Sequence, residues 1–322
     1  MNAFFSEFRT FSYVIKQSPS FLLFAHTHPD ADTIGATVAL AEFLRRKGKE
    51  VAIACFDPFP PHLAELFSET STTFLHPDQL DIHRYGAVIA CDSVDRGFDR
   101  ILGRLKPQQV TVTLDHHPDV SVPSDIEMVD AGYSSTCELL YTYFERNNEL
   151  LNQKIATALL AGIIFDTGNF QHACTTPRVM EVAGALMKKG ASLGRIVDTI
   201  FTNKSIPALR LWGKAFERSV FNEKNGMLVT AVTQQEVKDC CASIEHIYQV
   251  TSILSTVPEA KFAMVLSERD HETVRASLRS MERHNVDVSE IAHRFGGGGH
   301  RLASGFEIPG KIARVENGWA VV

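Results

Sequence analysis

HTHPDAD, residues 26–32, joins an apolar run to a helix. The run before it, residues 21–25, is short and continuous, which is typical of a strand buried on both faces. After it, residues 33–47 carry apolar side chains at helical spacing and end with basic residues. We therefore expect the stretch at a strand-to-helix turn, where an open α/β sheet binds its ligands.

The composition limits the class of protein. The chain has 322 residues, 44% of them hydrophobic, which is enough for two domains with cores of their own. A formal net charge of -6 argues against a protein that coats long nucleic acid, but it allows a small nucleotide site. The six cysteines lack the CxxC spacing of zinc sites and favour a reduced, cytoplasmic compartment. No apolar run approaches the roughly 20 residues of a membrane span, so we expect no membrane partner.

Two more predicted strands end on residues that can bind metal. Residues 86–91 and 110–114 repeat the buried-strand pattern, and they lead into Asp92 and into residues 115–117, which are Asp-His-His. Because the carboxyl ends of parallel strands meet at one edge of a sheet, these side chains should converge with those of residues 26–32. We predict an α/β domain with a mostly parallel sheet and helices on both faces.

The rest of the chain divides into a helical part and a second, smaller α/β part. A densely apolar helix at residues 155–165 delivers Asp166 to the end of the first domain. Beyond Gly226 strand patterns return. The elements predicted there are strands at 227–232, 261–266 and 273–278 and a helix at 288–294. We predict domains at 1–195 and 226–322, joined by a helical linker at 196–225.

The acidic residues expected at the sheet edge require cations. Four carboxylates close together would repel one another and take up protons unless positive charge balances them. Mixed carboxylate and imidazole ligands suit manganese, cobalt, iron or zinc better than magnesium or calcium. Two such ions about 3.5–4 Å apart can lower the pKa of a shared water and hold a phosphate. The residues that predict this phosphoesterase site are His26, Asp30, Asp32, Asp92, Asp115, His116, His117 and Asp166.

Each of these residues also has a plainer interpretation. Asp92 could cap a strand end and Asp166 a helix end. His28 forms a His-x-His pair with His26, as in amidohydrolase-type metal sites, but that alternative requires a barrel. Residues 115–117 are less ambiguous, because a buried strand rarely ends on three ionisable residues without a site to receive them.

A glycine run at residues 296–299 is the main chemical feature of the second part. Its backbone N–H groups can approach a phosphate closely, since no Cβ is in the way. Arg279 at a predicted strand end offers bidentate phosphate contact. A flexible loop and a solvated surface arginine are the alternatives. The predicted substrate-binding residues are Ser277, Arg279, Gly297, Gly298, Gly299 and His300.

Together these motifs resemble the DHH phosphoesterase superfamily. Residues 26–32, Asp92, residues 115–117 and residues 166–168 resemble its four ordered motifs, and residues 295–300 resemble the glycine-rich motif of its associated C-terminal domain. The resemblance implies two manganese ions, with magnesium or cobalt as alternatives, and an active-site cleft between the two domains.

The resemblance also implies a division of the ligands. One ion would be bound by His26, Asp30 and Asp92, and the other by Asp32, Asp92, His116 and Asp166. Asp92 would then bridge the ions and be central to catalysis. His117 would face the substrate, and Asp115 would orient the histidines. His28 falls at a variable position of the motif.

The length and motifs of the chain favour one group of enzymes within the superfamily. RecJ-type exonucleases are larger, and manganese-dependent pyrophosphatases lack the glycine–histidine motif. The chain is most similar to nanoRNases, bifunctional oligoribonucleases that also dephosphorylate 3′-phosphoadenosine 5′-phosphate. We expect it to act on short oligoribonucleotides or nucleotide bisphosphates and not on long duplexes; a homodimer is compatible with the sequence. The rivals are a phosphodiesterase for pApA or cyclic di-AMP and a nucleotide-binding protein without catalysis.

Overall fold

The computed structural model describes residues 4–68, 70, 73–93, 97–118, 120, 122–202, 204–269, 272–315 and 318–322. The chain divides into two compact units, Met1–Asn203 and Lys204–Val322. The division falls inside the segment 196–225 that we predict as a helical linker. Across the described residues, none of the helices has the length and apolar character needed to span a membrane.

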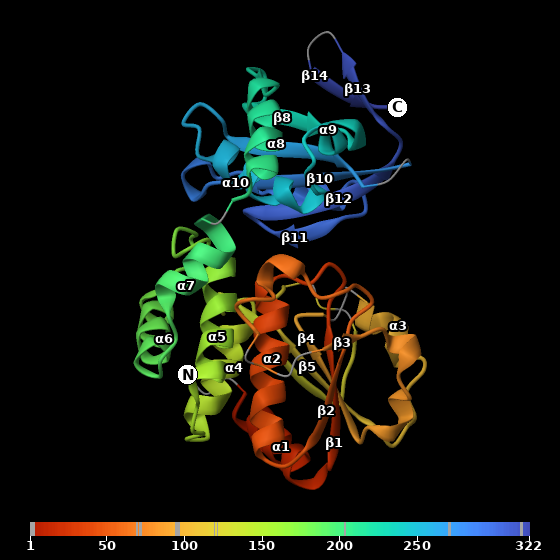
Figure 1. Ribbon diagram of the computed structural model, residues 1–322, viewed down its shortest axis with the longest axis vertical. Coiled ribbons are helices and arrows are strands. Elements are labelled where there is room, and N and C mark those ends of the chain that lie inside the picture. The colour runs from red at the N-terminus through yellow and green to blue at the C-terminus, as the bar shows by residue number, and fades with distance from the viewer. Residues whose placement is uncertain are drawn as a thin grey trace. The chain divides into compact units, whose positions relative to one another are not determined.

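A parallel sheet forms the framework of the first unit (Figure 1). Neighbouring strands run parallel in the order β3-β2-β1-β4-β5-β6. The chain moves outward from β1 to β3, crosses back to β4 beside β1, and continues outward the other way. Ligands of open α/β sheets bind where the order reverses, here between β1 and β4. The strands are β1 (Ser20–Ala25), β2 (Glu50–Ala54), β3 (Phe74–Leu75), β4 (Ala87–Cys91), β5 (Val110–Asp115) and β6 (Ile126–Val129).

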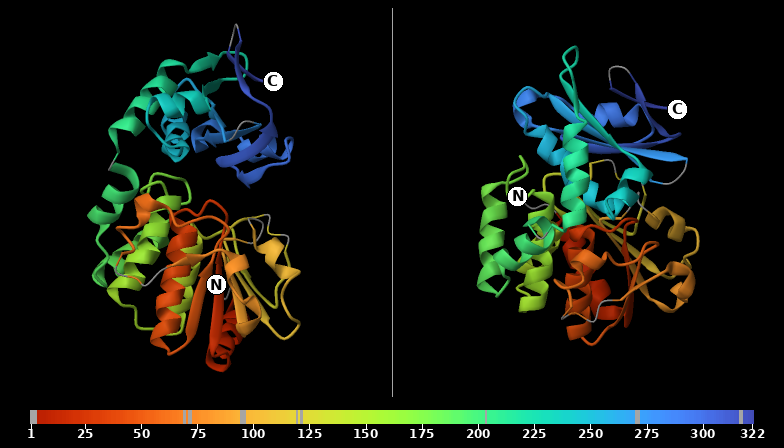
Figure 2. Two further views of the ribbon diagram at one scale, coloured as in Figure 1. Left: turned by 45° about the vertical axis from the view of Figure 1, so that its right-hand side comes forward. Right: turned by 45° about the horizontal axis from the view of Figure 1, so that its top comes forward.

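The two faces of this sheet carry separate cores. Because successive side chains of a strand point to opposite faces, Phe21 and Leu23 lie in one core and Leu22 and Phe24 in the other. Figure 1 shows α2 and α5 on one side of the sheet and α3 on the other, and Figure 2 gives two further views. The first core involves α1 (Phe5–Gln17), α2 (Ala31–Arg46), α4 (Thr136–Arg146), α5 (Gln153–Asp166), α6 (Pro177–Lys188) and α7 (Leu193–Val197); the second involves α3 (Asp99–Leu102).

Helices α2 and α5 pack closely because glycines face the contact. A Cβ at Gly35 of α2 would lie 2.4 Å from the carbonyl oxygen of Ala158 on α5. A Cβ at Gly162 of α5 would lie 2.5 Å from Oδ1 of Asp32 at the start of α2. Both distances are far below van der Waals contact, so any side chain at either position would push the helices apart. The close packing brings the two aspartates that end α5 and begin α2 into one region.

The second unit contains a mixed sheet with the strand order β11-β12-β10-β9-β8-β7. Only β8 and β9 are parallel among the described pairs. Its strands are β7 (Val220–Asn222), β8 (Met227–Val232), β9 (Phe262–Glu268), β10 (Thr273–Ser280), β11 (Gly298–His300) and β12 (Ala303–Pro309). One core contains residues of α8 (Ile206–Glu217), α9 (Gln234–Asp239) and α10 (Tyr248–Ser255); the other contains α11 (Val288–His293) and the hairpin of β13 (Ile312–Val315) and β14 (Gly318–Val321).

The structure confirms the predicted fold class, an α/β unit with a parallel sheet and helices on both faces followed by a smaller α/β unit. The predicted strands at 261–266 and 273–278 pair as antiparallel β9 and β10. Strands β3, β6, β7, β11, β12 and the C-terminal hairpin were not predicted. All but β12 are too short for their patterns to be distinguished from a loop, and β12 contains a glycine, which weakens a strand pattern. The cleft expected between the domains stays a prediction.

Candidate metal centre

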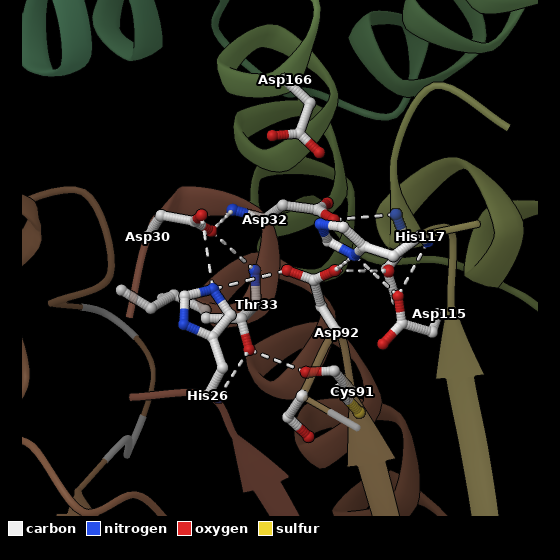
Figure 3. Close-up of polar contacts among 12 residues, drawn as sticks. His26, Asp30, Asp32, Thr33, Cys91, Asp92, Asp115, His117 and Asp166 are labelled. Carbon is white, nitrogen blue, oxygen red and sulfur yellow. Dashed lines mark hydrogen bonds and ion pairs between the residues drawn. The ribbon is translucent and has the colours of Figure 1, made fainter. Parts of the chain in front are cut away.

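Loops that follow three neighbouring strands of the first unit meet where the strand order reverses (Figure 3). His26 follows β1, Asp92 follows β4, and β5 ends on Asp115. The start of α2 and the end of α5 complete the region. Short contacts link all eight side chains predicted for this sheet edge, namely His26, Asp30, Asp32, Asp92, Asp115, His116, His117 and Asp166.

His26, Asp30 and Asp92 form the first cluster. Nε2 of His26 lies 3.3 Å from Oδ2 of Asp30 and 3.4 Å from Oδ2 of Asp92. The ring donates from Nδ1 to the backbone carbonyl of Thr27 at 2.7 Å, and its Nε2 faces the two carboxylates. Asp30 is the N-cap of α2, and its Oδ1 accepts from the backbone N–H groups of Asp32 and Thr33.

Asp32, Asp92 and His116 form the second cluster. Nε2 of His116 lies 3.7 Å from Oδ1 of Asp92 and 4.0 Å from Oδ2 of Asp32. It also lies 3.1 Å from Oδ2 of Asp166. Asp32 is fully buried, and its carboxylate accepts from the first two backbone N–H groups of α4 at 2.8 and 3.0 Å. The positive end of a helix thus faces this carboxylate.

Asp92 belongs to both clusters. Its Oδ2 faces His26 and its Oδ1 faces His116. The backbone φ of Asp92 is 56°, in the left-handed region that residues other than glycine seldom adopt. Its N–H donates to the carbonyl of Leu114 on β5 at 2.8 Å. A strained backbone held by a neighbouring strand is typical of functional positions, and here it places one carboxylate between two clusters.

Asp115 holds the ring of His117. One oxygen of Asp115 accepts from the backbone N–H of His117 at 2.9 Å and from its ring Nδ1 at 2.8 Å. The same Nδ1 lies 3.2 Å from Oδ1 of Asp92. The side chain of His117 is 19% exposed, compared with 7% for His116. His117 is therefore the more accessible histidine of the pair, with its orientation fixed by Asp115.

The buried site has an excess of negative charge. Burial and the nearby Asp166 and Asp92 raise the pKa of Asp32 well above its usual range. Burial also acts to raise the pKa of Asp92, but the adjacent imidazoles, chiefly His117, hold it well below its usual range. Although burial disfavours a charged imidazole, the hydrogen bond with Asp166 raises the pKa of His116 to about 10. Protons thus compensate part of the charge that divalent cations would neutralise.

The donor set fits two divalent cations. In each cluster, one potential ligand atom from every residue lies within 4.8 Å of the others, among the residues that the structure describes. The hydrogen bond from Nδ1 of His26 to a carbonyl is the arrangement that usually supports a metal-binding histidine. The three carboxylates and two imidazoles of these clusters, with Asp166 beside His116, suit transition metals that accept both oxygen and nitrogen. The site can therefore bind metal, while its composition does not identify the ion.

Four of the six predicted substrate-binding residues, Ser277, Arg279, Gly298 and His300, lie at register positions on one face of the second unit's sheet, whereas Gly299 pairs with Ser304 in the row between them. Arg279 lies opposite Ala303 of β12, and Ala303 lies opposite His300 of β11. In the next row of that face, Gly305 of β12 lies between Ser277 and Gly298. Residues directly opposite one another on antiparallel strands point to the same face. The first row therefore has a small residue between two long side chains, and the second row consists only of small residues.

The glycine run forms a packed strand and turn. A Cβ at Gly297 would lie 2.2 Å from the carbonyl oxygen of Gly305. Gly299 has a φ of 131°, and a Cβ there would lie 2.7 Å from the carbonyl oxygen of Ala303. These close approaches to β12 require glycine. The alternative of a flexible loop is wrong for this segment, since Gly298–His300 is strand β11.

Family models match both units of the chain. Residues 20–163 match the N-terminal domain of the DHH family, and residues 227–317 match the DHHA1 domain. The chain belongs to the DHH phosphoesterase family. It is a hydrolase acting on phosphate esters, as the sequence predicts.

Two curated relatives of this DHH protein carry the name bifunctional oligoribonuclease and PAP phosphatase NrnA. The Bacillus subtilis protein is 28% identical over 293 residues, which cover 89% of this chain and 88% of that protein. The Thermus thermophilus protein is 29% identical over 287 residues, which cover 88% and 83%. These relatives match the chain over nearly its whole length.

Solved structures show the same fold. An exopolyphosphatase-related protein from Bacteroides fragilis has a TM-score of 0.85 at 22% identity, covering 94% of this chain and 91% of that one. RecJ of Thermus thermophilus, solved with Mn2+, has a TM-score of 0.53 at 12% identity and covers 94% of this chain but 51% of that one. RecJ is thus the larger protein, as expected for RecJ-type members of the family.

His28 of the DHH domain lies apart from the two clusters. Its side chain is 58% exposed, and its Nδ1 is 3.9 Å from Oδ2 of Asp57. Its backbone N–H donates to the same oxygen at 2.8 Å. The amidohydrolase-type alternative, in which His26 and His28 bind one metal, is wrong because the sheet of this unit is open and is not a barrel.

Sequence reasoning missed the residues that hold the acidic groups of the DHH domain in place. Thr33 and Thr136 form hydrogen bonds with several of the segments that carry these acidic groups. Gly162 allows Asp32 to approach α5. Ser135 is the N-cap of α4, and Thr136 is the first residue of that helix. The sequence offered one signal for Thr136: it directly follows the N-cap residue and takes no part in the cap itself.

Proposed function

We propose that this chain hydrolyses very short RNA oligonucleotides from an end, releasing mononucleotides, and dephosphorylates 3′-phosphoadenosine 5′-phosphate to AMP. Asp92 carries the proposal, because its two oxygens face two separate clusters of carboxylates and imidazoles. The similarity to proteins named bifunctional oligoribonuclease and PAP phosphatase NrnA supports the choice of substrate.

Two divalent ions would be held by the two clusters. His26, Asp30 and Asp92 bind one ion, and Asp32, Asp92, His116 and Asp166 bind the other. Bound there, such ions lower the pKa of a water and neutralise charge on a phosphate. Manganese suits the mixed oxygen and nitrogen donors, with magnesium or cobalt as alternatives. Asp92 fixes the two clusters relative to each other, because it belongs to both.

His117 acts on the substrate in this scheme. Asp115 holds the ring through Nδ1. The ring then presents Nε2 to the substrate, where it stabilises charge on a phosphate oxygen or gives a proton to the leaving oxygen. Asp115 serves by fixing the orientation of the ring.

The second unit binds the substrate's phosphate. The guanidinium of Arg279 can make two parallel hydrogen bonds to a phosphate, and His300 in the same row adds another donor. The backbone of Gly297, Gly298 and Gly299 and the hydroxyl of Ser277 complete the set. A short substrate agrees with a net charge of -6, which disfavours long duplexes. A homodimer and a cytoplasmic location stay predictions.

A substrate panel tests the proposal. The protein is incubated with Mn2+ and, separately, di- to pentanucleotide RNA, 3′-phosphoadenosine 5′-phosphate, pApA and a long RNA duplex, and the products are separated by chromatography. We expect mononucleotides from short RNA and AMP from the bisphosphate, with the duplex intact. Absence of a released mononucleotide from every substrate would contradict the proposal.

A second candidate is a phosphodiesterase for pApA or cyclic di-AMP. It is supported by the Geobacillus thermodenitrificans protein named cyclic-di-AMP phosphodiesterase GdpP, which is 28% identical over 316 residues. The match covers 89% of this chain but only 44% of that protein. Including cyclic di-AMP in the same panel separates the two. A kcat/KM for pApA or cyclic di-AMP far above that for short RNA would favour the second candidate.

A further inference from the structure

Two threonines with fully buried side chains, Thr33 and Thr136, form hydrogen bonds with residues of the two clusters. We infer that Thr33 positions the cluster of His26, Asp30 and Asp92, whereas Thr136 positions the cluster of Asp32, Asp92 and His116. The inference deepens the proposed function and rests on it, since it assigns to each metal subsite a positioning residue that does not itself bind the ion.

Thr33 joins the three segments of the first cluster (Figure 3). Its hydroxyl donates at 2.7 Å to the carbonyl of Cys91, the residue before Asp92. The same oxygen accepts from the backbone N–H of His26 at 3.3 Å. The ends of β1 and β4 are therefore tied through one hydroxyl, which uses its donor on one strand and a lone pair on the other.

The backbone of Thr33 serves the remaining residue of that cluster. Its N–H donates at 3.2 Å to Oδ1 of Asp30. This bond leaves Oδ2 of Asp30 facing Nε2 of His26. One residue thus fixes the backbone at His26, the backbone next to Asp92 and the rotamer of Asp30.

Thr136 joins two carboxylates of the second cluster. Its N–H donates to Oδ2 of Asp32 at 2.8 Å, and its hydroxyl donates to Oδ1 of Asp92 at 3.3 Å. Oδ1 is the oxygen of Asp92 that faces His116. As the first residue of α4, Thr136 is held by the helix, so it sets the separation of the two carboxylates. Such outer contacts orient metal ligands, and losing one typically weakens metal binding by about 10–100-fold.

Backgrounds with one disabled cluster separate the two roles. His116→Ala disables the second cluster and His26→Ala the first, and Mn2+ binding is measured by equilibrium dialysis with metal analysis. In the His116→Ala background, Thr33→Val should weaken Mn2+ binding at the remaining site by about 10–100-fold. Thr136→Val should weaken it less, because the oxygen of Asp92 that Thr136 contacts faces the disabled cluster. In the His26→Ala background, Thr136→Val should have the larger effect on Mn2+ binding and Thr33→Val the smaller one.

Serine and valine variants provide the controls. Thr33→Ser and Thr136→Ser keep the hydroxyl and should retain the affinity of their background. Thr37→Val is the matched control, because Thr37 is also fully buried and its hydroxyl donates to backbone carbonyls of its own helix, including that of Thr33 at 2.8 Å. It should leave Mn2+ binding unchanged. Thermal unfolding in chelator confirms that each variant folds, and Thr33→Ala or Thr136→Ala replaces a valine variant that does not.

The outcomes distinguish this inference from the proposed function. Equal weakening in both backgrounds, unchanged binding in either, or failure of the serine variants to retain affinity would overturn the inference. So would the failure of every hydroxyl-free variant to fold, since the threonine would then be structural. If the unmodified protein bound no Mn2+ and hydrolysed no substrate, the proposed function would fall instead.

Discussion

The two units of the molecule handle charge in opposite ways. In the first unit, ionisable side chains such as Asp32, Asp92 and His116 are buried together at strand ends. In the second unit, Arg279 and His300 are only partly buried and lie beside small residues on the face of a sheet. Buried like charges are stable only when something compensates them, whereas partly exposed groups need no such compensation. The first unit is therefore suited to chemistry with cations and the second to binding an anion.

Backbone strain accompanies the site of the first unit but is not confined to it. Asp92, which belongs to both clusters, has a positive φ angle, as do Asn169 and Phe170 shortly after Asp166; Cys241 and Asn285 of the second unit also have positive φ angles. Such conformations persist only where surrounding contacts enforce them, and they accompany a fixed arrangement of reacting groups. In kinetic terms, damage to the first unit should lower kcat, and damage to the second should raise KM.

The strongest test of this comparison is Asp92→Ala. We expect kcat to fall by about three orders of magnitude or more, because metal ions supply several kcal/mol of transition-state stabilisation and Asp92 serves both clusters. Steady-state hydrolysis of 3′-phosphoadenosine 5′-phosphate with Mn2+ measures the effect. Asp125→Ala, on the exposed residue that accepts from Thr111, is the control and should retain activity. Activity of Asp92→Ala near that of the unmodified protein would remove Asp92 from the site and favour a chain that binds nucleotides without catalysis.

The sequence predicts the acidic groups of the first unit better than the residues that hold them. Apolar runs at 21–25, 86–91 and 110–114 end on ionisable residues, and this abrupt change marks the sheet edge. The contact of Thr136 with Asp32 spans 104 positions of the chain, and no local pattern indicates it. The same holds for Gly162, whose need for glycine arises only where α5 meets Asp32.

In the second unit, the three strands β8, β9 and β10 were predictable but the lateral order of the sheet was not. The apolar patterns at 227–232 and 273–278 correspond to β8 and β10. Strand β12, however, lies between β10 and β11, and only this placement brings Arg279 into one row with His300. Antiparallel register depends on the partner strand, so neither residue's sequence neighbours reveal the row.

Removal of metal tests whether the buried charge of the first unit needs cations. Free Mn2+ at about 100 times its Kd would stabilise the folded unit by about 2.7 kcal/mol. Chelation should therefore lower the unfolding temperature of this unit by about 5–10 °C and leave that of the second unit unchanged. Differential scanning calorimetry with chelator, and again after Mn2+ is restored, measures both transitions. Asp92→Ala should show little response, and an equal shift of both units would contradict the proposed location of the metal.

Arg279→Gln tests the binding role of the second unit. Hydrogen bonds to charged groups contribute about 1.5–3 kcal/mol, so KM should rise by about 10–100-fold while kcat changes less. The matched control is Arg275→Gln on the same strand, where Arg275 lies 4.0 Å from Glu307 and should not affect KM. Steady-state kinetics on the bisphosphate give both constants. A loss confined to kcat would assign Arg279 to the chemical step. It would contradict the assignment of catalysis to the first unit and of substrate binding to the second.

Two helical glycines provide the finest comparison, because the same substitution should have opposite signs in the two units. A Cβ at Gly162 of α5 would lie 2.4 Å from Sγ of Cys137 and 2.5 Å from Oδ1 of Asp32. At Gly213 of α8, among the described residues outside its own helix, nothing lies within 4 Å of a Cβ. Overpacking costs about 1–3 kcal/mol, whereas alanine in an open helix is more stable than glycine by about 0.5–1 kcal/mol.

Gly162→Ala should therefore destabilise the first unit, and Gly213→Ala should slightly stabilise the second, as measured by urea unfolding of each variant. Because the added methyl group displaces Asp32, Gly162→Ala should also weaken Mn2+ binding, and Gly213→Ala should leave it unchanged. Destabilisation by both variants would mean that α8 packs as tightly as α5. Destabilisation by Gly162→Ala with unaltered Mn2+ binding would mean that Asp32 tolerates displacement, and that the tight packing of the first unit serves its stability rather than its metal ligands.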